Sequence, residues 1–170
     1  MQLFVECIKT PIGALLITHD GRALANLAFL DREERRAREL KRDIPGARLK
    51  RTIKPTPFAT ALARYFDGDI RAIDKLPIIT IGTDFQKRCW QALRRVRPGT
   101  TRTYGAHART IGRPAASRAV GAANGFNPIS IVIPCHRLVG ANGALVNYGG
   151  GLERKRWLID HEAQHANASA

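Results

Sequence analysis

The sequence predicts an α/β protein with two lobes, and three observations support this prediction. Residues 3–30 alternate between apolar runs and turn signals, a pattern typical of an antiparallel β-meander. Residues 70–82 are interrupted by proline and glycine, which indicates a boundary between lobes. Residues 83–125 contain apolar residues at helical spacing. An α/β lobe followed by a mostly helical lobe accounts for all three.

We place the domains at residues 1–76 and 77–170. In the first, residues 31–42 form either a highly charged helix or a flexible excursion, to which we assign no function. The stretch that follows, IPGARLKRTIKPTP, breaks the pattern with prolines and a glycine. Residues 58–69 then predict a short helix that ends near a glycine.

The second domain is predicted to begin with a helix at residues 83–96, with Thr83 or Asp84 as its N-cap. Cys89 lies on the apolar stripe of this helix, so we expect a core residue. Two short helices at about 103–111 and 115–124 follow. Their spacing fits a helix–turn–helix, although many helical hairpins look similar.

The second helix of this pair carries one long side chain among small ones. Ala116, Val120 and Ala123 form a stripe that faces inward, while Arg118 and Gly121 lie on another face. A helix that reads the major groove carries several long polar side chains, so this one suits a narrow groove with one inserted probe. The alternative is an internal helix with its arginine in a salt bridge.

The charge of the chain indicates an anionic partner. The formal net charge is +14, and ten basic residues but no acidic one lie between Asp84 and Glu153. Carboxylates would repel a phosphate ligand, so such a segment suits a nucleic-acid surface; an idle basic face is the alternative.

We expect a cytoplasmic protein without membrane contact. No apolar run approaches the roughly 20 residues that span a bilayer, and the N-terminus shows no secretory signal. The three cysteines are too few and too scattered for a disulfide framework, and we expect no metal site.

The stretch IVIPCHRLVG places Cys135 beside His136. Residues 131–133 predict a short buried strand that ends at a proline, which leaves the cysteine at a strand end. Neighbours on extended chain point to opposite sides, so direct contact between the two needs a turn or a bridging water. Glu162, one turn beyond Leu158 on a C-terminal helix, can point inward and meet His136; a glutamate that faces water is the alternative. A structural buried cysteine is the alternative.

Together the motifs resemble the O6-alkylguanine-DNA alkyltransferases, also called methylated-DNA–protein-cysteine methyltransferases. The resemblance is dense over residues 83–162 and looser before them. It implies an N-terminal ribonuclease-H-like α/β lobe and a mostly helical, winged-helix-like C-terminal lobe with a helix–turn–helix. The stretches that carry it are YG at 104–105, ASRAVGAANGFNPI at 116–129, PCHR at 134–137, NYGGG at 147–151 and RKRWLIDHE at 154–162.

The resemblance implies DNA repair by direct, irreversible and stoichiometric transfer of an alkyl group to Cys135. The alkyl donor would be O6-alkylguanine, and also O4-alkylthymine, reached by minor-groove binding and base flipping. The partner would be double-stranded DNA that carries the lesion, with possible cooperative self-association on it. No cofactor is implied, and each molecule would act once.

The resemblance also assigns roles to residues. Glu162, His136 and a water would activate Cys135, Tyr148 would donate to the departing guanine, and Asn127 would hold the turn before the cysteine. Arg118 would fill the base stack, and Tyr104 would press on a phosphate. The full DNA-binding set is Tyr104, Ser117, Arg118, Ala119 and Gly121, and the substrate-pocket set is Leu138, Asn147 and Gly149.

Two other functions stay open on the sequence alone. A DNA-binding regulator would use the helix–turn–helix without chemistry. A Cys-His hydrolase would turn over an acyl substrate, whereas an alkyl acceptor would take one group and stop.

Overall fold

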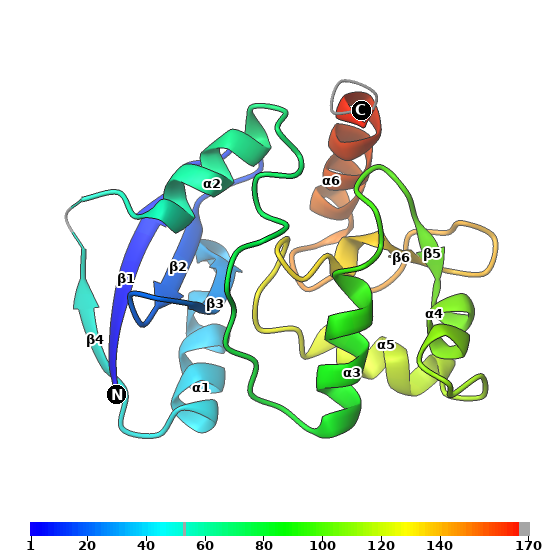
Figure 1. Ribbon diagram of the computed structural model, residues 1–170, viewed down its shortest axis with the longest axis horizontal. Coiled ribbons are helices and arrows are strands. Elements are labelled where there is room, and N and C mark those ends of the chain that lie inside the picture. Colours follow the sequence, from blue (N-terminus) through cyan, green and yellow to red (C-terminus); the bar gives the residue numbers. More distant parts are fainter. Residues whose placement is uncertain (53, 167–170) are drawn as a thin grey trace. The chain divides into compact units, whose positions relative to one another are not determined.

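The computed structural model describes residues 1–52 and 54–166, which form two compact units (Figure 1). Unit 1 holds residues 1–81 together with 128–130, and unit 2 holds residues 82–127 and the described residues from Ile131 onward. Residues 77–81 belong to unit 1 because the Leu24 N–H donates to the Pro77 carbonyl at 2.9 Å and the Ile79 N–H donates to the Leu24 carbonyl at 2.7 Å. The domain boundary at 76–77 remains a prediction.

No helix in the described ranges is long and apolar enough to cross a membrane.

Unit 1 contains a four-stranded sheet in the order β3-β2-β1-β4. β1 (Gln2–Ile8), β2 (Leu15–His19) and β3 (Leu24–Phe29) form the predicted antiparallel meander. At the tight turn after β2, the Asp20 carboxylate accepts hydrogen bonds from the backbone N–H groups of Arg22 and Ala23, while Gly21 takes a positive φ of 96°. The turn signals therefore set the register of this hairpin.

β4 (Arg48–Arg51) was not predicted. It lies in the stretch broken by prolines and glycine, and it runs parallel to β1 with Leu49 opposite Leu3. All four of its residues are exposed, so it has no alternating apolar pattern that a sequence could display. The strand forms because the backbone groups on the free edge of β1 pair with it.

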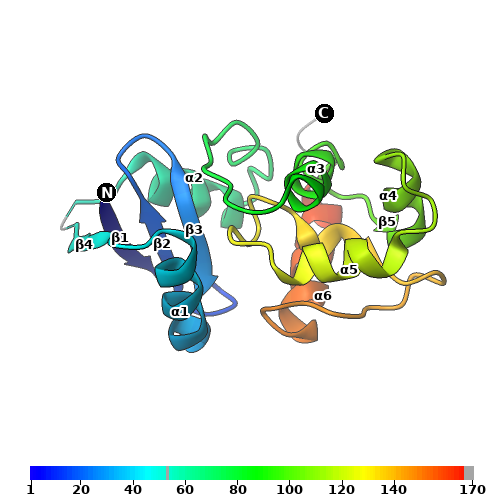
Figure 2. The same cartoon turned by 90° about the horizontal axis from the view of Figure 1, so that it is seen from below.

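Helices lie on both faces of this sheet (Figure 2). A short 3-10 turn, η1 (Leu30–Arg32), leads into α1 (Glu33–Asp43), so the charged segment is a helix rather than a flexible excursion. On one face, Leu40 of α1 packs on a cluster that contains Leu3 and Ile44. On the other face lies α2 (Pro57–Phe66), whose Phe58 contacts His19 with ring centroids 5.0 Å apart.

Unit 2 begins with α3 (Asp84–Leu93), which has the predicted N-terminal cap. The Thr83 hydroxyl accepts from the Gln86 N–H, and the Gln86 side chain accepts from the Thr83 N–H. The indole N–H of Trp90 donates to the Ala123 carbonyl at 3.0 Å, which joins this helix to the helix–turn–helix. Cys89 is fully buried, as predicted, and burial raises the pKa of its thiol to about 11.

The predicted helix pair is present as α4 (Tyr104–Thr110) and α5 (Ser117–Gly125). Gly112 provides the positive φ, 71°, of the turn between them. The inward stripe of α5 is confirmed at Val120 and Ala123, which are almost fully buried, while Arg118 is exposed. β5 (Arg102–Thr103) pairs in parallel with β6 (Leu138–Val139) beside these helices.

The predicted strand at residues 131–133 is wrong. The three residues are buried, but Ile131 and Val132 form a turn, and Ile131 has a positive φ of 71°, which is rare for a β-branched residue. The reason is topological: residues 128–130 pair with β3 of unit 1, and the chain must then turn to enter unit 2. Cys135 therefore lies in a 3-10 turn, η2 (Cys135–Arg137), and not at a strand end.

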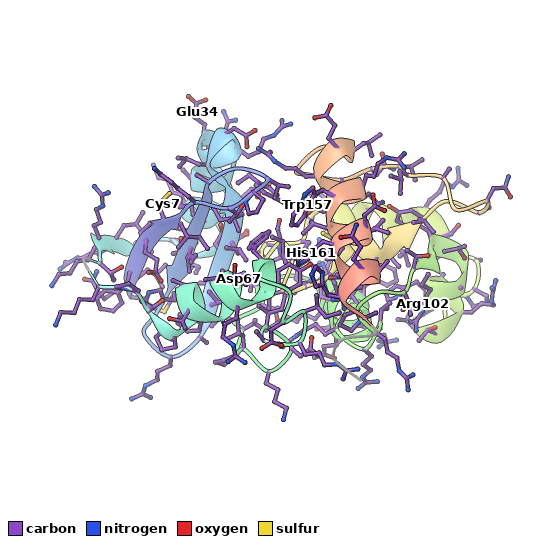
Figure 3. The ribbon with its side chains drawn as sticks, turned by 90° about the horizontal axis from the view of Figure 1, so that it is seen from above. Cys7, Glu34, Asp67, Arg102, Trp157 and His161 are labelled. Atoms are coloured by element: carbon purple, nitrogen blue, oxygen red, sulfur yellow. The ribbon has the colours of Figure 1, made fainter. Side chains whose placement is uncertain are left out.

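α6 (Leu152–His165) closes the described chain. Figure 3 labels Trp157 and His161 on this helix, and their rings stack with centroids 4.7 Å apart. Lys155, Leu158 and Glu162 are almost fully buried. Their i, i+3, i+7 spacing places them on one face of the helix, and this face carries part of the candidate site.

Candidate active site

Cys135 is the first residue of η2, and its side chain is held by an amide. The residue is only 5% exposed. The Asn127 amide nitrogen lies 3.0 Å from the Cys135 sulfur and 2.8 Å from the Ile133 carbonyl oxygen, so it donates to both. The Asn124 amide donates to the Cys135 carbonyl at 3.2 Å. An N–H group aimed at sulfur stabilises negative charge there, which favours the reactive thiolate.

His136 is fully buried and pairs with Glu162, with Nε2 and Oε1 2.8 Å apart. Burial lowers the pKa of His136, and this outweighs the opposite effect of the Glu162 charge, so the imidazole is neutral at pH 7. A carboxylate only accepts hydrogen bonds, so Nε2 must carry the proton. The lone pair is then on Nδ1, a buried atom with no hydrogen-bond partner among the described residues. His136 is thus a base whose tautomer Glu162 sets.

Arg137 holds the same carboxylate. Its Nε and Nη2 each lie 2.9 Å from an oxygen of Glu162, and its Nη1 donates to the Val96 carbonyl at 2.6 Å. Burial alone would raise the pKa of Glu162, but His136 and Arg137 together hold it far below its ordinary value. The Gly99 N–H adds a further donor at 3.3 Å. Glu162 is therefore an ionised carboxylate fixed from several sides.

Lys155 is a second buried cation in the site. Its ammonium donates to the Val146 carbonyl at 2.6 Å and lies 5.8 Å from the centre of the Tyr104 ring. Burial lowers the pKa of Lys155 to about 8, although negative charge on Cys135 acts in the opposite direction. The same charge contributes to the raised pKa of Tyr104, whose main cause is burial. The pKa values of Lys155 and Tyr104 therefore both depend on the ionisation of Cys135.

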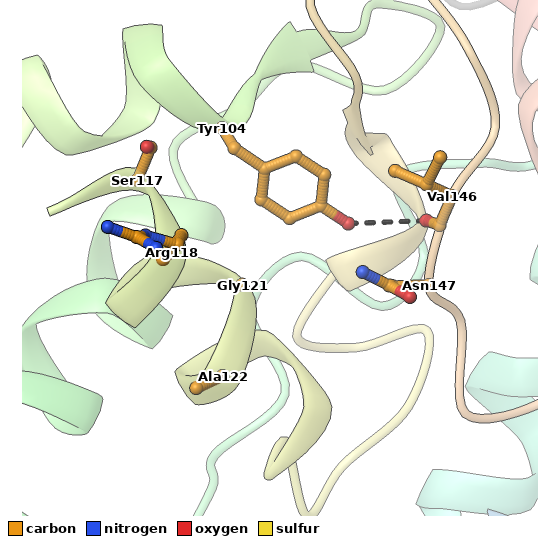
Figure 4. Close-up of a pocket in the computed structure, with 7 residues that line it drawn as sticks. All are labelled: Tyr104, Ser117, Arg118, Gly121, Ala122, Val146 and Asn147. Atoms are coloured by element: carbon orange, nitrogen blue, oxygen red, sulfur yellow. Dashed lines mark hydrogen bonds between the residues drawn. The ribbon is translucent and has the colours of Figure 1, made fainter.

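A pocket of about 420 Å³ opens between α4, α5 and the loop before α6 (Figure 4). The Tyr104 hydroxyl crosses one side of it and donates to the Val146 carbonyl at 3.3 Å. Asn147 adopts a positive φ of 47°, which asparagine tolerates better than most residues. The lining residues are Tyr104, Ser117, Arg118, Gly121, Ala122, Val146 and Asn147.

The pocket gathers residues that the sequence assigned to two separate sets. Four of the five predicted DNA-binding residues line it, together with Asn147 from the predicted substrate pocket. Ala119 is exposed on α5 outside this lining, Gly149 is exposed in the loop, and Leu138 is fully buried in β6. Tyr148 is half-buried, and its ring lies edge-on to His136 with centroids 6.5 Å apart. The roles of these residues remain predictions.

Sequence reasoning missed three contributors: Asn124, Arg137 and Lys155. Arg137 was counted in the basic segment and in the PCHR stretch, and Lys155 only in the stretch at 154–162, with no role for either, yet both are almost fully buried. A signal was present for Lys155, which shares a helical face with Leu158 and Glu162. Among the described residues, no group of three or more His, Cys, Asp or Glu side chains could hold a metal ion.

Two family models match the chain over nearly its whole length. Residues 3–80 match the ribonuclease-like domain of 6-O-methylguanine DNA methyltransferase, and residues 84–164 match its DNA binding domain. The methylated-DNA–protein-cysteine methyltransferase of Salmonella typhimurium is 45% identical over 95% of this chain and 96% of its own length. The protein of the same name from Mycobacterium bovis is 43% identical over 98% and 96%.

Solved structures agree with this. A Mycobacterium tuberculosis OGT crystallised in complex with DNA is 36% identical, with a TM-score of 0.78 over 97% of this chain and 94% of its own. The O6-methylguanine-DNA methyltransferase of the archaeon Pyrococcus kodakaraensis is 26% identical, with a TM-score of 0.74 over 94% and 98%. The two-part fold, the matched domains and the full-length relatives lead to one conclusion: this chain belongs to the 6-O-methylguanine DNA methyltransferase family.

Proposed function

We propose that this protein repairs DNA by moving the alkyl group of O6-alkylguanine onto the sulfur of its own Cys135. The observation that carries the proposal is the thiol itself, which accepts from Asn127 and lies beside a neutral His136 backed by Glu162 and Arg137. This arrangement suits a cysteine that must lose a proton before it attacks. Full-length relatives named for the same reaction support the proposal.

In the proposed mechanism, a water relays the Cys135 proton to Nδ1 of His136, and Glu162 stabilises the imidazolium that forms. The thiolate then attacks the alkyl carbon in line with the C–O6 bond. The S–C bond forms as the C–O6 bond breaks, and the electron pair stays on the guanine. Tyr148 donates a proton as the base departs, so that guanine leaves neutral, and the Gly149 N–H supports O6. The proton count closes when the imidazolium returns its proton to the tyrosinate through solvent.

The route to the thiol begins at the DNA. We propose that α5 enters the minor groove, that Arg118 fills the stack left by the flipped base, and that Tyr104 presses on the neighbouring phosphate. Extrusion costs a few kcal/mol, and less for a poorly paired lesion, which favours damaged bases. O4-alkylthymine would enter by the same route. In support, Arg118 is exposed on a helix whose other outward residues are small.

Intact mass spectrometry after incubation with O6-methylguanine duplex DNA tests the proposal. We expect one added methyl per chain, mapped to Cys135, and no further gain with excess substrate. An unchanged mass, a methyl on Cys89, or continued turnover would contradict it.

Arg118→Ala is expected to slow repair of duplex DNA by at least about tenfold, since loss of an intercalating side chain removes part of the few kcal/mol that offset unstacking. Reaction with free O6-methylguanine base should be nearly unchanged, because no base stack is opened. Single-turnover rates on the two substrates measure the difference. Arg95→Ala removes an exposed arginine just beyond α3 and serves as the charge-matched control. Equal losses on both substrates would contradict the role of Arg118.

Lys155→Met is expected to slow methyl transfer by at least about tenfold, because removing a cation near the thiolate costs about 1.4 kcal/mol or more. The rate of the native protein should also fall as pH rises through about 8, where Lys155 loses its proton, and the variant should lack this step. Stability should not fall in parallel. Because the pKa of Lys155 is lower in the folded protein than its unfolded value of 10.5, its charge destabilises the fold fully below about pH 8. This destabilisation disappears as the pH rises from about 8 to 10.5.

Quenched transfer assays across this pH range measure the rate, and thermal melts across the same range measure the stability. Arg156→Met, at an exposed neighbouring position on α6, is the control. A variant that loses activity only in proportion to its loss of folded protein would show that Lys155 is merely structural.

Cooperative self-association on DNA is a further proposal, which rests on the family resemblance. Titrations with duplexes of increasing length test it, since cooperative binding would steepen the isotherm as more copies fit.

A further inference from the structure

β4 forms a bare edge of the sheet in unit 1. It pairs with β1 on one side, and all four of its residues are exposed. The opposite edge, β3, is instead covered by other segments of the chain, because Leu24 exchanges hydrogen bonds with residues 77–79 and Leu27 with residues 128–130. An uncovered edge presents outward backbone groups to a partner.

The chain around this edge carries only positive charge. No acidic residue lies between Asp43 and Asp67. Of the basic residues in that interval, Arg64 forms an ion pair with Asp69. The other four form no ion pair with any residue whose side chain the structure describes; they are Arg48, Lys50, Arg51 and Lys54.

The strand spreads this charge over both sides of the edge. Arg48 and Lys50 alternate with Leu49 and Arg51, so two cations point to one face of the sheet and one to the other. Residues two apart on a strand are about 7 Å apart. Two cations therefore lie side by side on one face of the exposed edge, and a third lies on the opposite face.

Protection against aggregation accounts for only part of this charge. Short length and charged side chains keep an edge strand from pairing with a second strand, but here three of four residues are cationic and the charge continues to Lys54, beyond the strand. Two copies of the edge would also repel each other. The charge therefore favours a partner that is anionic along its length and that can lie against an exposed strand.

We propose that the β4 edge binds the phosphate backbone of duplex DNA, as a second DNA-binding surface besides the helices of unit 2. The choice of DNA as the polyanion rests on the proposed function. Contacts of this kind read no sequence and raise affinity for undamaged duplex. They would hold the protein on DNA while it searches for a lesion.

The triple variant R48Q/K50Q/R51Q tests the surface in the full chain. The slope of log affinity against log salt for an undamaged duplex should fall by about 2 to 3, at about 0.9 per lost phosphate contact. The control, K9Q/R71Q/K75Q, removes the same charge from exposed positions of unit 1 away from β4. We expect its slope to stay close to that of the native protein. Equal slopes for the two variants would overturn the proposal.

A photo-crosslinker at Leu49 identifies the partner directly, since this side chain is 58% exposed at the centre of the strand. An adduct with labelled duplex supports the proposal. An adduct only with a second copy of the chain would make β4 a protein contact and overturn it. The same holds if the triple variant loses binding to RNA or to anionic phospholipid vesicles while its DNA slope is unchanged.

Methyl transfer from free O6-methylguanine base separates this proposal from the proposed function. The triple variant should transfer as fast as the native protein, because none of its three changes touches the active site. It should melt at the same temperature, because all three side chains are exposed. Normal transfer with equal salt slopes would refute only the β4 surface. Absence of transfer in the native protein would refute the repair reaction itself.

Discussion

Cys135→Ser is expected to abolish methyl transfer completely while binding to O6-methylguanine duplex DNA survives. A serine hydroxyl in the same place has far too high a pKa to ionise with a neutral imidazole as base, so no nucleophile forms. The substitution is nearly isosteric, and the Asn127 amide that donates to sulfur can donate to oxygen. Intact mass after incubation with substrate measures transfer, and a gel-shift assay measures binding.

Cys7→Ser is the matched control, because it also removes one thiol, but from an exposed position on β1. It should take up one methyl at the native rate. Cys89 should remain unmodified in every variant, since its thiol is fully buried and its pKa is raised to about 11. If Cys135→Ser kept its biological activity, the protein would act as a DNA-binding regulator. If it kept turnover of an acyl substrate, another nucleophile would be at work.

The family resemblance, carried by motifs such as PCHR at 134–137, implied the nucleophile and its relay. From the residues alone a structural buried cysteine stayed open for Cys135, and only Glu162 had a local signal, because its spacing from Leu158 places it on the inner face of its helix. Arg137 had no comparable signal, since a basic residue is usually solvated. Lys155 had one in its spacing from Leu158 and Glu162, but the same expectation outweighed it. The burial of Arg137 depends on partners far along the chain, Val96 and Glu162. Lys155 contacts Val146 in the loop before its own helix, and the path of that loop is not visible in the sequence.

The fold shows the same division between local and distant causes. The meander of β1 to β3 was predictable because turn residues such as Asp20 and Gly21 specify its hairpins locally. β4 was not, because its partner β1 lies about 46 residues earlier and three of its own four residues are charged. Residues 131–133 have the composition of a strand, but the passage of the chain from unit 1 to unit 2 forces a turn there. Non-local pairing outweighs local propensity in both places.

Glu162→Gln is expected to slow methyl transfer by about 100-fold or more and to destabilise the fold by about 3 kcal/mol. The rate falls because the relay loses the charge that stabilises the His136 imidazolium, an effect of the size typical of general acid–base catalysis. The stability falls because Arg137, itself only 2% exposed, is left as a buried cation without a counter-charge. The amide oxygen still accepts from Nε2, so the histidine tautomer should survive.

Single-turnover transfer rates and urea unfolding at neutral pH measure the two effects separately. Glu153→Gln, an exposed position in the first turn of the same helix, is the control and should change stability by a few tenths of a kcal/mol. A destabilised variant with a native rate per folded molecule would make Glu162 structural only. A slow variant of native stability would mean that Arg137 does not depend on this carboxylate.

The difference in unfolding free energy between the native protein and Glu162→Gln should depend on pH, which gives a sharper test. The folded pKa of Glu162 lies far below its ordinary value of 4.5, so the carboxylate contributes its full stabilisation above that pH. As the pH falls below 4.5, the native protein must keep a carboxylate ionised that would be protonated in the unfolded chain, and its advantage shrinks. Glu162→Gln has no such proton to gain. The two unfolding curves should therefore converge in acid, and a gap that stays constant below pH 4.5 would show that the ionised Glu162 is not what holds Arg137 and His136.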